Sequence, residues 1–132
     1  MPMNNPKAEH VDFGEFEGLV PDNPKWSASN IDMCYHRANK DRTIDSFMFV
    51  EWKHPNEREI LPGQKFLLNA LSRQPNTIVL LVIGWSKPND VQVDKVYKVS
   101  KGGLKELSME EGQTGIQKLK SLITIWYDWV SK

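Results

Sequence analysis

Hydrophobic and polar residues alternate in the first half of the chain in a way that predicts a β-hairpin. Residues 29–36 have the alternation of a strand, with Asp32 on the face opposite to Ile31. A polar turn follows at 38–42, and an apolar run over 47–53 then has the composition of a returning strand. The pattern therefore predicts two antiparallel strands joined by a short turn.

The second half of the chain changes between helical and strand periodicity. Leucines at helical spacing predict a helix over 60–73, and the β-branched run 77–84 predicts a strand that is covered on both faces. Alternation over 91–99 indicates an outer strand, and 116–130 has one apolar helical face. The order strand, strand, helix, strand, strand, helix predicts an α/β fold with a mixed sheet flanked by helices.

The N-terminal residues give weaker signals. Apolar spacing over 8–20 is compatible with a short helix that Gly14 and Gly18 interrupt. Residues 1–7 are polar and contain two prolines, which is typical of a disordered tail and not of a secretory signal. A length of 132 residues suits one domain, so we expect residues 1–132 to form a single unit.

Composition narrows the possible functions. The 17 basic and 17 acidic residues balance, so the net charge gives no general attraction to nucleic acid. A local cluster of charged residues with a divalent metal could still hold a phosphodiester. No apolar run approaches the roughly 20 residues that span a bilayer. Cys34 is the single cysteine, which favours a reducing cytoplasm, and we expect it to be a small buried hydrophobic residue.

Two charged residues interrupt the apolar run of the second strand. Glu51 and Lys53 are two positions apart, so they lie on the same face of a strand. Pairing of the two hairpin strands can bring Asp32 to the same edge. Two carboxylates are typical ligands of Mg²⁺, and a lysine beside them can hold an attacking water or stabilise charge on a phosphate. This set predicts hydrolysis of a phosphodiester bond.

The pattern of an acidic residue, any residue and a lysine has little value alone. With 17 acidic residues and 13 lysines, about two chance matches are expected, and Glu51 to Lys53 is the one present. The plain alternative is a solvated salt bridge on an edge strand, with Asp32 as an ordinary hairpin carboxylate. Asp45 shares the strand face of Glu51 and is a weaker substitute for Asp32.

With Gly63 and Gln64 opening the next helix, these residues resemble the PD-(D/E)XK nuclease superfamily. The resemblance is to its small branches that are similar to Holliday-junction resolvases and to the virus-type replication-repair nucleases (VRR-NUC) of phages. It covers residues 27–84, the predicted catalytic core, and it implies a restriction-endonuclease-like fold. Ile31 departs from the family pattern, which has proline before the aspartate.

The resemblance also implies roles for individual residues. Asp32, Glu51 and the backbone carbonyl of Trp52 would bind Mg²⁺ or Mn²⁺, Lys53 would assist the nucleophilic water, and Gln64 would support the site. A glutamate from an N-terminal helix often joins the metal in this family, and the sequence does not choose between Glu15 and Glu17. For Gln64, the alternative is a polar residue at a helix start.

Basic residues near the predicted site are candidates for contact with the DNA backbone, the alternative being solvated charges. They are Arg37, Lys40, Arg42, His54, Arg58 and Lys65. Three aromatic residues of the last helix, Trp126, Tyr127 and Trp129, suit either the core or a homodimer interface.

Taken together, these features predict a Mg²⁺-dependent DNA endonuclease, specific for a DNA structure and active in phage or mobile-element DNA processing. The alternative is an inactive module of the same fold that binds DNA or protein, and a more distant one is an interaction protein.

Overall fold

The structure is a computed structural model that describes residues 15, 17–25, 28–57, 62–101 and 103–132. The chain divides into two units, Met1–Asn30 and Ile31–Lys132. The predicted tail over 1–7 and most of the predicted helix over 8–20 lie outside the described residues, although Glu17 and Gly18 form a turn. The predicted catalytic core therefore lies almost wholly in the second unit.

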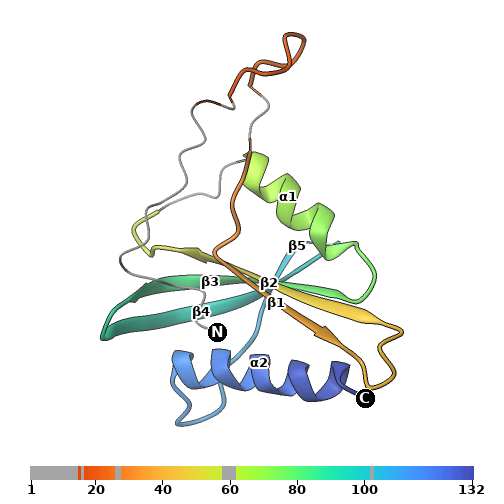
Figure 1. Cartoon of the computed structure of the whole chain (residues 1–132). Coiled ribbons are helices and arrows are strands. Elements are labelled where there is room, and N and C mark those ends of the chain that lie inside the picture. Colours follow the sequence, from red (N-terminus) through yellow and green to blue (C-terminus); the bar gives the residue numbers. More distant parts are fainter. Residues whose placement is uncertain (1–14, 16, 26–27, 58–61, 102) are drawn as a thin grey trace. The chain divides into compact units, whose positions relative to one another are not determined.

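The second unit has a five-stranded sheet and two helices (Figure 1). The elements are β1 (Met33–Ala38), β2 (Asp45–Lys53), α1 (Pro62–Ser72), β3 (Thr77–Lys87), β4 (Asp90–Ser100), β5 (Gly103–Glu106) and α2 (Gly115–Val130). The strands lie in the order β1-β2-β3-β4-β5. β1 and β2 form the predicted antiparallel hairpin, whereas β2 and β3 are parallel, so α1 makes the crossover between them. The prediction of an α/β fold with a mixed sheet flanked by helices is confirmed.

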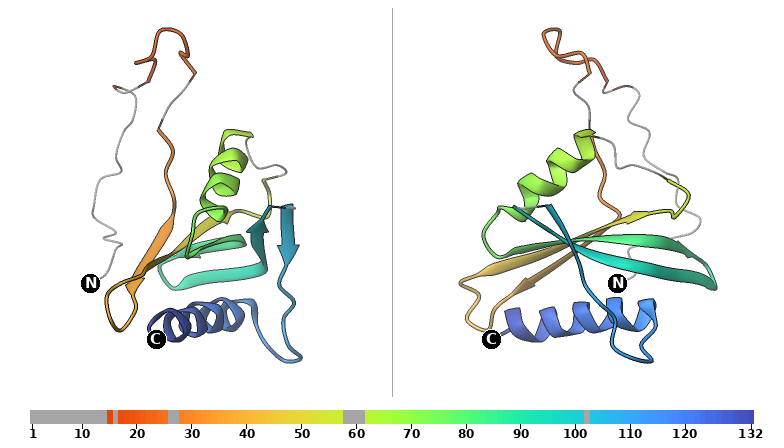
Figure 2. Two further views of the ribbon diagram at one scale, coloured as in Figure 1. Left: turned by 90° about the vertical axis from the view of Figure 1, so that its right-hand side faces the viewer. Right: turned by 180° about the vertical axis from the view of Figure 1, so that it is seen from behind.

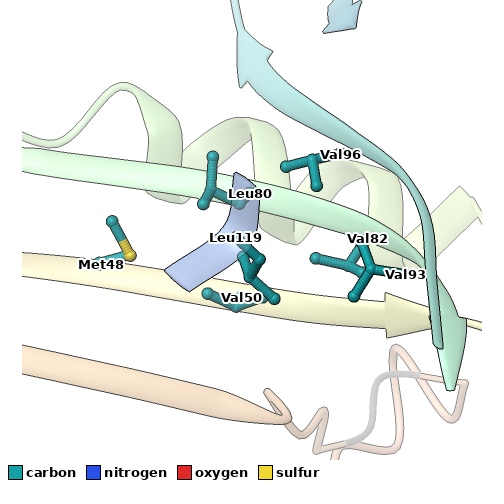
Figure 3. Close-up of a cluster of buried hydrophobic side chains, with 7 residues drawn as sticks. All are labelled: Met48, Val50, Leu80, Val82, Val93, Val96 and Leu119. Atoms are coloured by element: carbon teal, nitrogen blue, oxygen red, sulfur yellow. The ribbon is translucent and has the colours of Figure 1, made fainter. Parts of the chain in front are cut away.

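The two helices cover opposite faces of the sheet (Figure 2). On the α2 face, buried residues from β2, β3, β4 and α2 form one hydrophobic cluster (Figure 3), which consists of Met48, Val50, Leu80, Val82, Val93, Val96 and Leu119. On the α1 face, a second cluster contains Leu68, Val79, Leu81 and Val99. Because successive strand residues point to opposite faces, β3 supplies both clusters, as its continuous apolar run predicts.

Strand β4 differs from its predicted role as an outer strand. β5 pairs with it through residues 103–106, a segment too short and too charged to show strand alternation. The register between β3 and β4 also shifts at Ile83 and Gly84. A Cβ at Gly84 would overlap the carbonyl oxygen of Gln92, so the irregularity requires glycine. Because of this shift, Val93 faces α2 together with Val96, whereas Val99 faces α1 by ordinary alternation.

Helix α2 begins at a capping box and lies close to the sheet. The Thr114 hydroxyl accepts a hydrogen bond from the Gln117 backbone N–H, and the Gln117 side chain accepts one from the Thr114 N–H. A Cβ at Gly115 would overlap the Val93 carbonyl oxygen, so glycine allows the helix start to touch β4. Of the predicted aromatic residues, Trp126 packs against the core while Tyr127 and Trp129 are exposed.

Neither of the described helices is both long and apolar enough to cross a membrane.

Candidate active site

Glu51 and Lys53 lie side by side on the α1 face of the sheet. Glu51 pairs with Leu81 of β3, a member of the α1-face cluster, and Lys53 follows two residues later with the same orientation. β2 is an interior strand between β1 and β3. Both charged residues are consequently buried, with 4% of Glu51 and 7% of Lys53 exposed.

Neither buried charge has a complete set of partners. Oε2 of Glu51 and Nζ of Lys53 have no hydrogen-bond partner among the described residues. Over the same residues, salt bridges join His36 to Asp45 and Lys95 to Glu106, and none joins Glu51 to Lys53. The alternative of a solvated salt bridge on an edge strand is therefore wrong. A buried polar atom without a partner costs about 1–3 kcal/mol, and more when it is charged.

Asp32 is held opposite Glu51 by the end of the β1–β2 ladder. The last paired residues are Met33 and Val50, so the next step along the register places Asp32 across from Glu51. The backbone N–H of Trp52 donates a hydrogen bond of 2.8 Å to Oδ2 of Asp32. The aspartate side chain thus takes the place of a strand carbonyl, and it also contacts the Glu51 carboxyl. Asp32 itself is exposed, which leaves this edge of the site open to solvent.

Gln64 reaches the same site from α1. It lies in the first turn of the helix, and its side-chain amide is close enough to the Glu51 carboxyl to influence the pKa of that group. The crossover from β2 through α1 returns the chain above β3, which brings the helix start close to the end of β2. The structure therefore brings Asp32, Glu51 and Gln64 into contact, with Lys53 on the same strand face.

These surroundings raise the pKa of Glu51 to about 8 from an ordinary value of 4.5. Burial is the largest cause, because it removes water from the charged form. The neighbouring carboxyl and the charge of Asp32 raise the pKa further, while the Gln64 amide and the Trp52 backbone lower it. Two carboxyl groups in contact share a proton more easily than they share two negative charges.

The metal-free chain should lose stability as the pH rises from about 5 to about 8, because over this range the folded state keeps a proton on Glu51 that the unfolded chain releases. With a folded pKa of about 8, each pH unit lowers the free energy of unfolding by at most about 1.4 kcal/mol. Thermal unfolding in EDTA over this range measures the effect. Glu51→Gln should give a flatter curve than the wild type, and equal slopes would contradict the raised pKa.

The residues present fit a hard divalent cation. Mg²⁺ is usually bound by one or two protein carboxylates, with water and phosphate oxygens as its other ligands. Asp32 and Glu51 provide two such carboxylates, and Oε2 of Glu51 has no hydrogen-bond donor of its own. Among the described residues, no group of three or more His, Cys, Asp or Glu side chains is placed to hold a metal. Glu15 and Glu17 are exposed residues of the first unit.

The predicted DNA-contacting residues are placed in different environments. Arg37 faces α2, where its guanidinium lies 4.4 Å from the centre of the Tyr127 ring and Nε donates to the Ser131 hydroxyl. His54 stacks on Trp85 and accepts a hydrogen bond from a backbone N–H. Lys40 and Arg42 are exposed on the hairpin turn, and Lys65 is exposed on α1. Arg58 lies outside the described residues.

Strand alternation determines which face of the sheet each β1 side chain occupies. Cys34 faces the same side as Asp32 and is exposed, so the expectation that it is buried is wrong. Asp45 does not approach Glu51, because it lies at the other end of β2 and forms a 2.7 Å pair with His36. Counting forward from Asp32 in steps of two reaches Cys34 on the same face, and the register pairs Asp45 with Ala38 at the other end of the hairpin.

Comparison with protein-family models finds no match for this chain, and neither do comparisons with curated proteins and with solved structures.

Proposed function

We propose that this protein is a Mg²⁺-dependent DNA endonuclease with a site similar to that of PD-(D/E)XK nucleases. One observation carries the proposal. Glu51 and Lys53 are buried on one strand face, with Oε2 and Nζ lacking partners, while Asp32 contacts the same Glu51 carboxyl. Such an arrangement is costly for a fold, and a divalent cation with a bound phosphate supplies the missing partners of both charges.

Each residue has a distinct role in this proposal. Asp32 and Glu51 would hold the cation, with the Trp52 carbonyl as a further ligand, and Gln64 would support the site through its amide beside the Glu51 carboxyl. The bound cation supplies Lewis-acid stabilisation of the phosphate and a more acidic water. Lys53 donates to the attacking water or to the phosphate oxygen on which charge develops. The proposed substrate is a structured DNA in phage or mobile-element DNA processing, and Mn²⁺ is an alternative cation.

An inactive module with the same fold is the second candidate. It is favoured by one observation, which is that the described residues offer two carboxylates at the site and no third ligand from a side chain. Such a module would bind DNA or protein without cutting. An interaction protein with unrelated surface charges is not supported, because the Asp32 and Glu51 carboxyl groups are in contact.

Cleavage of a panel of branched, flapped, single-stranded and linear DNA substrates tests the proposal. We expect nicking in Mg²⁺ or Mn²⁺ and none in EDTA, with calorimetry showing that the free chain binds the cation. Cation binding without cleavage of any substrate would favour the inactive module. Absence of both would reject a metal site.

A further inference from the structure

The α1 face of the sheet is only partly covered by its helix. α1 packs against β3 and β4, and among the described residues of the second unit no helix covers the β1–β2 side of the same face. On β1 this side carries the exposed residues Cys34 and His36, and on β2 it carries Phe47 and Phe49, both half-buried. The open part of the sheet begins beside the Asp32 and Glu51 pair and continues toward the hairpin turn.

Three rings follow one another along this open face. The His36 and Phe47 ring centres are 5.1 Å apart, and those of Phe47 and Phe49 are 6.2 Å apart with the two planes within 9° of parallel. Glu51 is the next residue on the same face of β2. We call His36, Phe47 and Phe49 the aromatic row. Phe47 and Phe49 are partly buried, and Phe49 packs against the α1-face cluster, so their remaining exposed surface is what flat groups can contact.

The two ends of the aromatic row differ in charge. At the turn end, Lys40 and Arg42 line a hollow of about 690 Å³, whose lining continues to Arg37 and Ser131 on the α2 side of the sheet. Asp45 also lines it and is paired with His36. At the other end lie the carboxylates of Asp32 and Glu51. The six residue-to-residue steps from Asp45 to Glu51 extend over about 20 Å in a strand, so Lys40 and Arg42, the rings and the candidate metal ligands follow one line.

We infer that the aromatic row binds single-stranded DNA, with unpaired bases stacked on Phe47 and Phe49 and the backbone running from Lys40 and Arg42 to the Asp32 and Glu51 site. This inference rests on the proposed function and names its substrate class. A duplex keeps its bases inside the stack, so it has no free base faces for these rings. Lys40 and Arg42 can each contact a phosphate of a polyanion, with Asp41 between them in the turn, whereas a second copy of this neutral chain offers them no excess of negative charge.

Fluorescence anisotropy in EDTA tests the inference without any need for cleavage. The probes are a fluorescein-labelled oligothymidylate and a blunt hairpin duplex with the same label. We expect the single strand to bind more tightly, and Phe47→Leu to weaken its binding by about 5- to 30-fold with little change for the duplex. Phe66→Leu is the matched control, because Phe66 is 73% exposed on α1 and lies outside the aromatic row.

A second pair of variants examines the turn end separately. Lys40→Gln and Arg42→Gln change exposed residues and are expected to keep the fold. Each should reduce the slope of log affinity against log salt by about 0.7 for the single strand. Equal binding of single strand and duplex by the wild type, or a Phe47→Leu variant that binds like Phe66→Leu, would overturn the inference. A change of oligomeric state with Phe47→Leu at unchanged DNA affinity would also overturn it.

The two proposals fail in different ways. If the chain binds single strands through the aromatic row but cuts no substrate in Mg²⁺ or Mn²⁺, the nuclease proposal fails while the inference of single-strand binding stands. If it cuts DNA while Phe47→Leu has no effect on single-strand affinity, the row is rejected and the nuclease assignment stands.

Discussion

Glu51→Gln is expected to lower Mg²⁺-dependent DNA cleavage by about 10³-fold or more, because an amide keeps the shape of the side chain but removes the charge that holds the cation. The same substitution should leave the metal-free chain folded and, at pH values near 8, more stable than the wild type, because it removes the cost of a buried carboxylate beside Asp32. If Glu51→Gln loses activity and gains stability, the Glu51 charge serves function and does not stabilise the fold.

Single-turnover cleavage and thermal unfolding of the same preparations measure both effects. Glu106→Gln is the matched control, since Glu106 is an exposed carboxylate on the same sheet with Lys95 as its partner at 4.0 Å. It should change neither activity nor stability appreciably. A Glu51→Gln variant that cleaves like the wild type at the same Mg²⁺ concentration would reject the metal site.

Lys53→Met should lower the rate of cleavage by about 10²- to 10³-fold, the usual effect of removing one group that stabilises charge in a transition state. Methionine has a similar length and fills the same buried space without an ammonium group. The affinity for Mg²⁺, measured by calorimetry, should not fall, because Lys53 is not a ligand. The free energy of unfolding should rise by about 1–3 kcal/mol, since the buried Nζ has no partner to lose.

Lys95→Met provides the control for this substitution, because the Lys95 side chain is 58% exposed and lies on β4 of the same sheet. Its cleavage rate and stability should stay close to those of the wild type. If Lys53→Met destabilised the chain while the reaction rate per folded molecule was unchanged, Lys53 would be a packing residue and its proposed catalytic role would be excluded.

The local pattern of apolar and polar residues was sufficient to predict most of the fold. The hairpin, the helix that starts at Pro62, the buried strand at Thr77 and the last helix follow from periodicity, because each buries one stripe or one face against the sheet. The placement of Asp32 beside Glu51 was also within reach, since antiparallel pairing across a short turn fixes which residues face each other.

Other features depend on contacts between segments that are distant in the sequence. Burial of Lys53 follows from β3 pairing alongside β2, which a strand taken alone does not reveal. Arg37 is adjacent to predicted site residues in sequence, yet alternation turns it to the opposite face, where α2 supplies Tyr127 as its partner. The shift at Gly84 inverts the faces of β4, and a period of two cannot anticipate an extra residue in one strand.

The sheet of the second unit separates two surfaces that can bind different molecules. The candidate site and the aromatic row belong to the α1 side, whereas the outer surface of α2 carries Ile125, Tyr127 and Trp129 at 63%, 47% and 71% exposure. A molecule bound to those α2 residues would leave the carboxylates accessible. A label or surface tether attached at position 125 is accordingly a suitable way to immobilise the chain for single-molecule assays on DNA, whereas Ser131 lines the hollow beside Lys40 and Arg42.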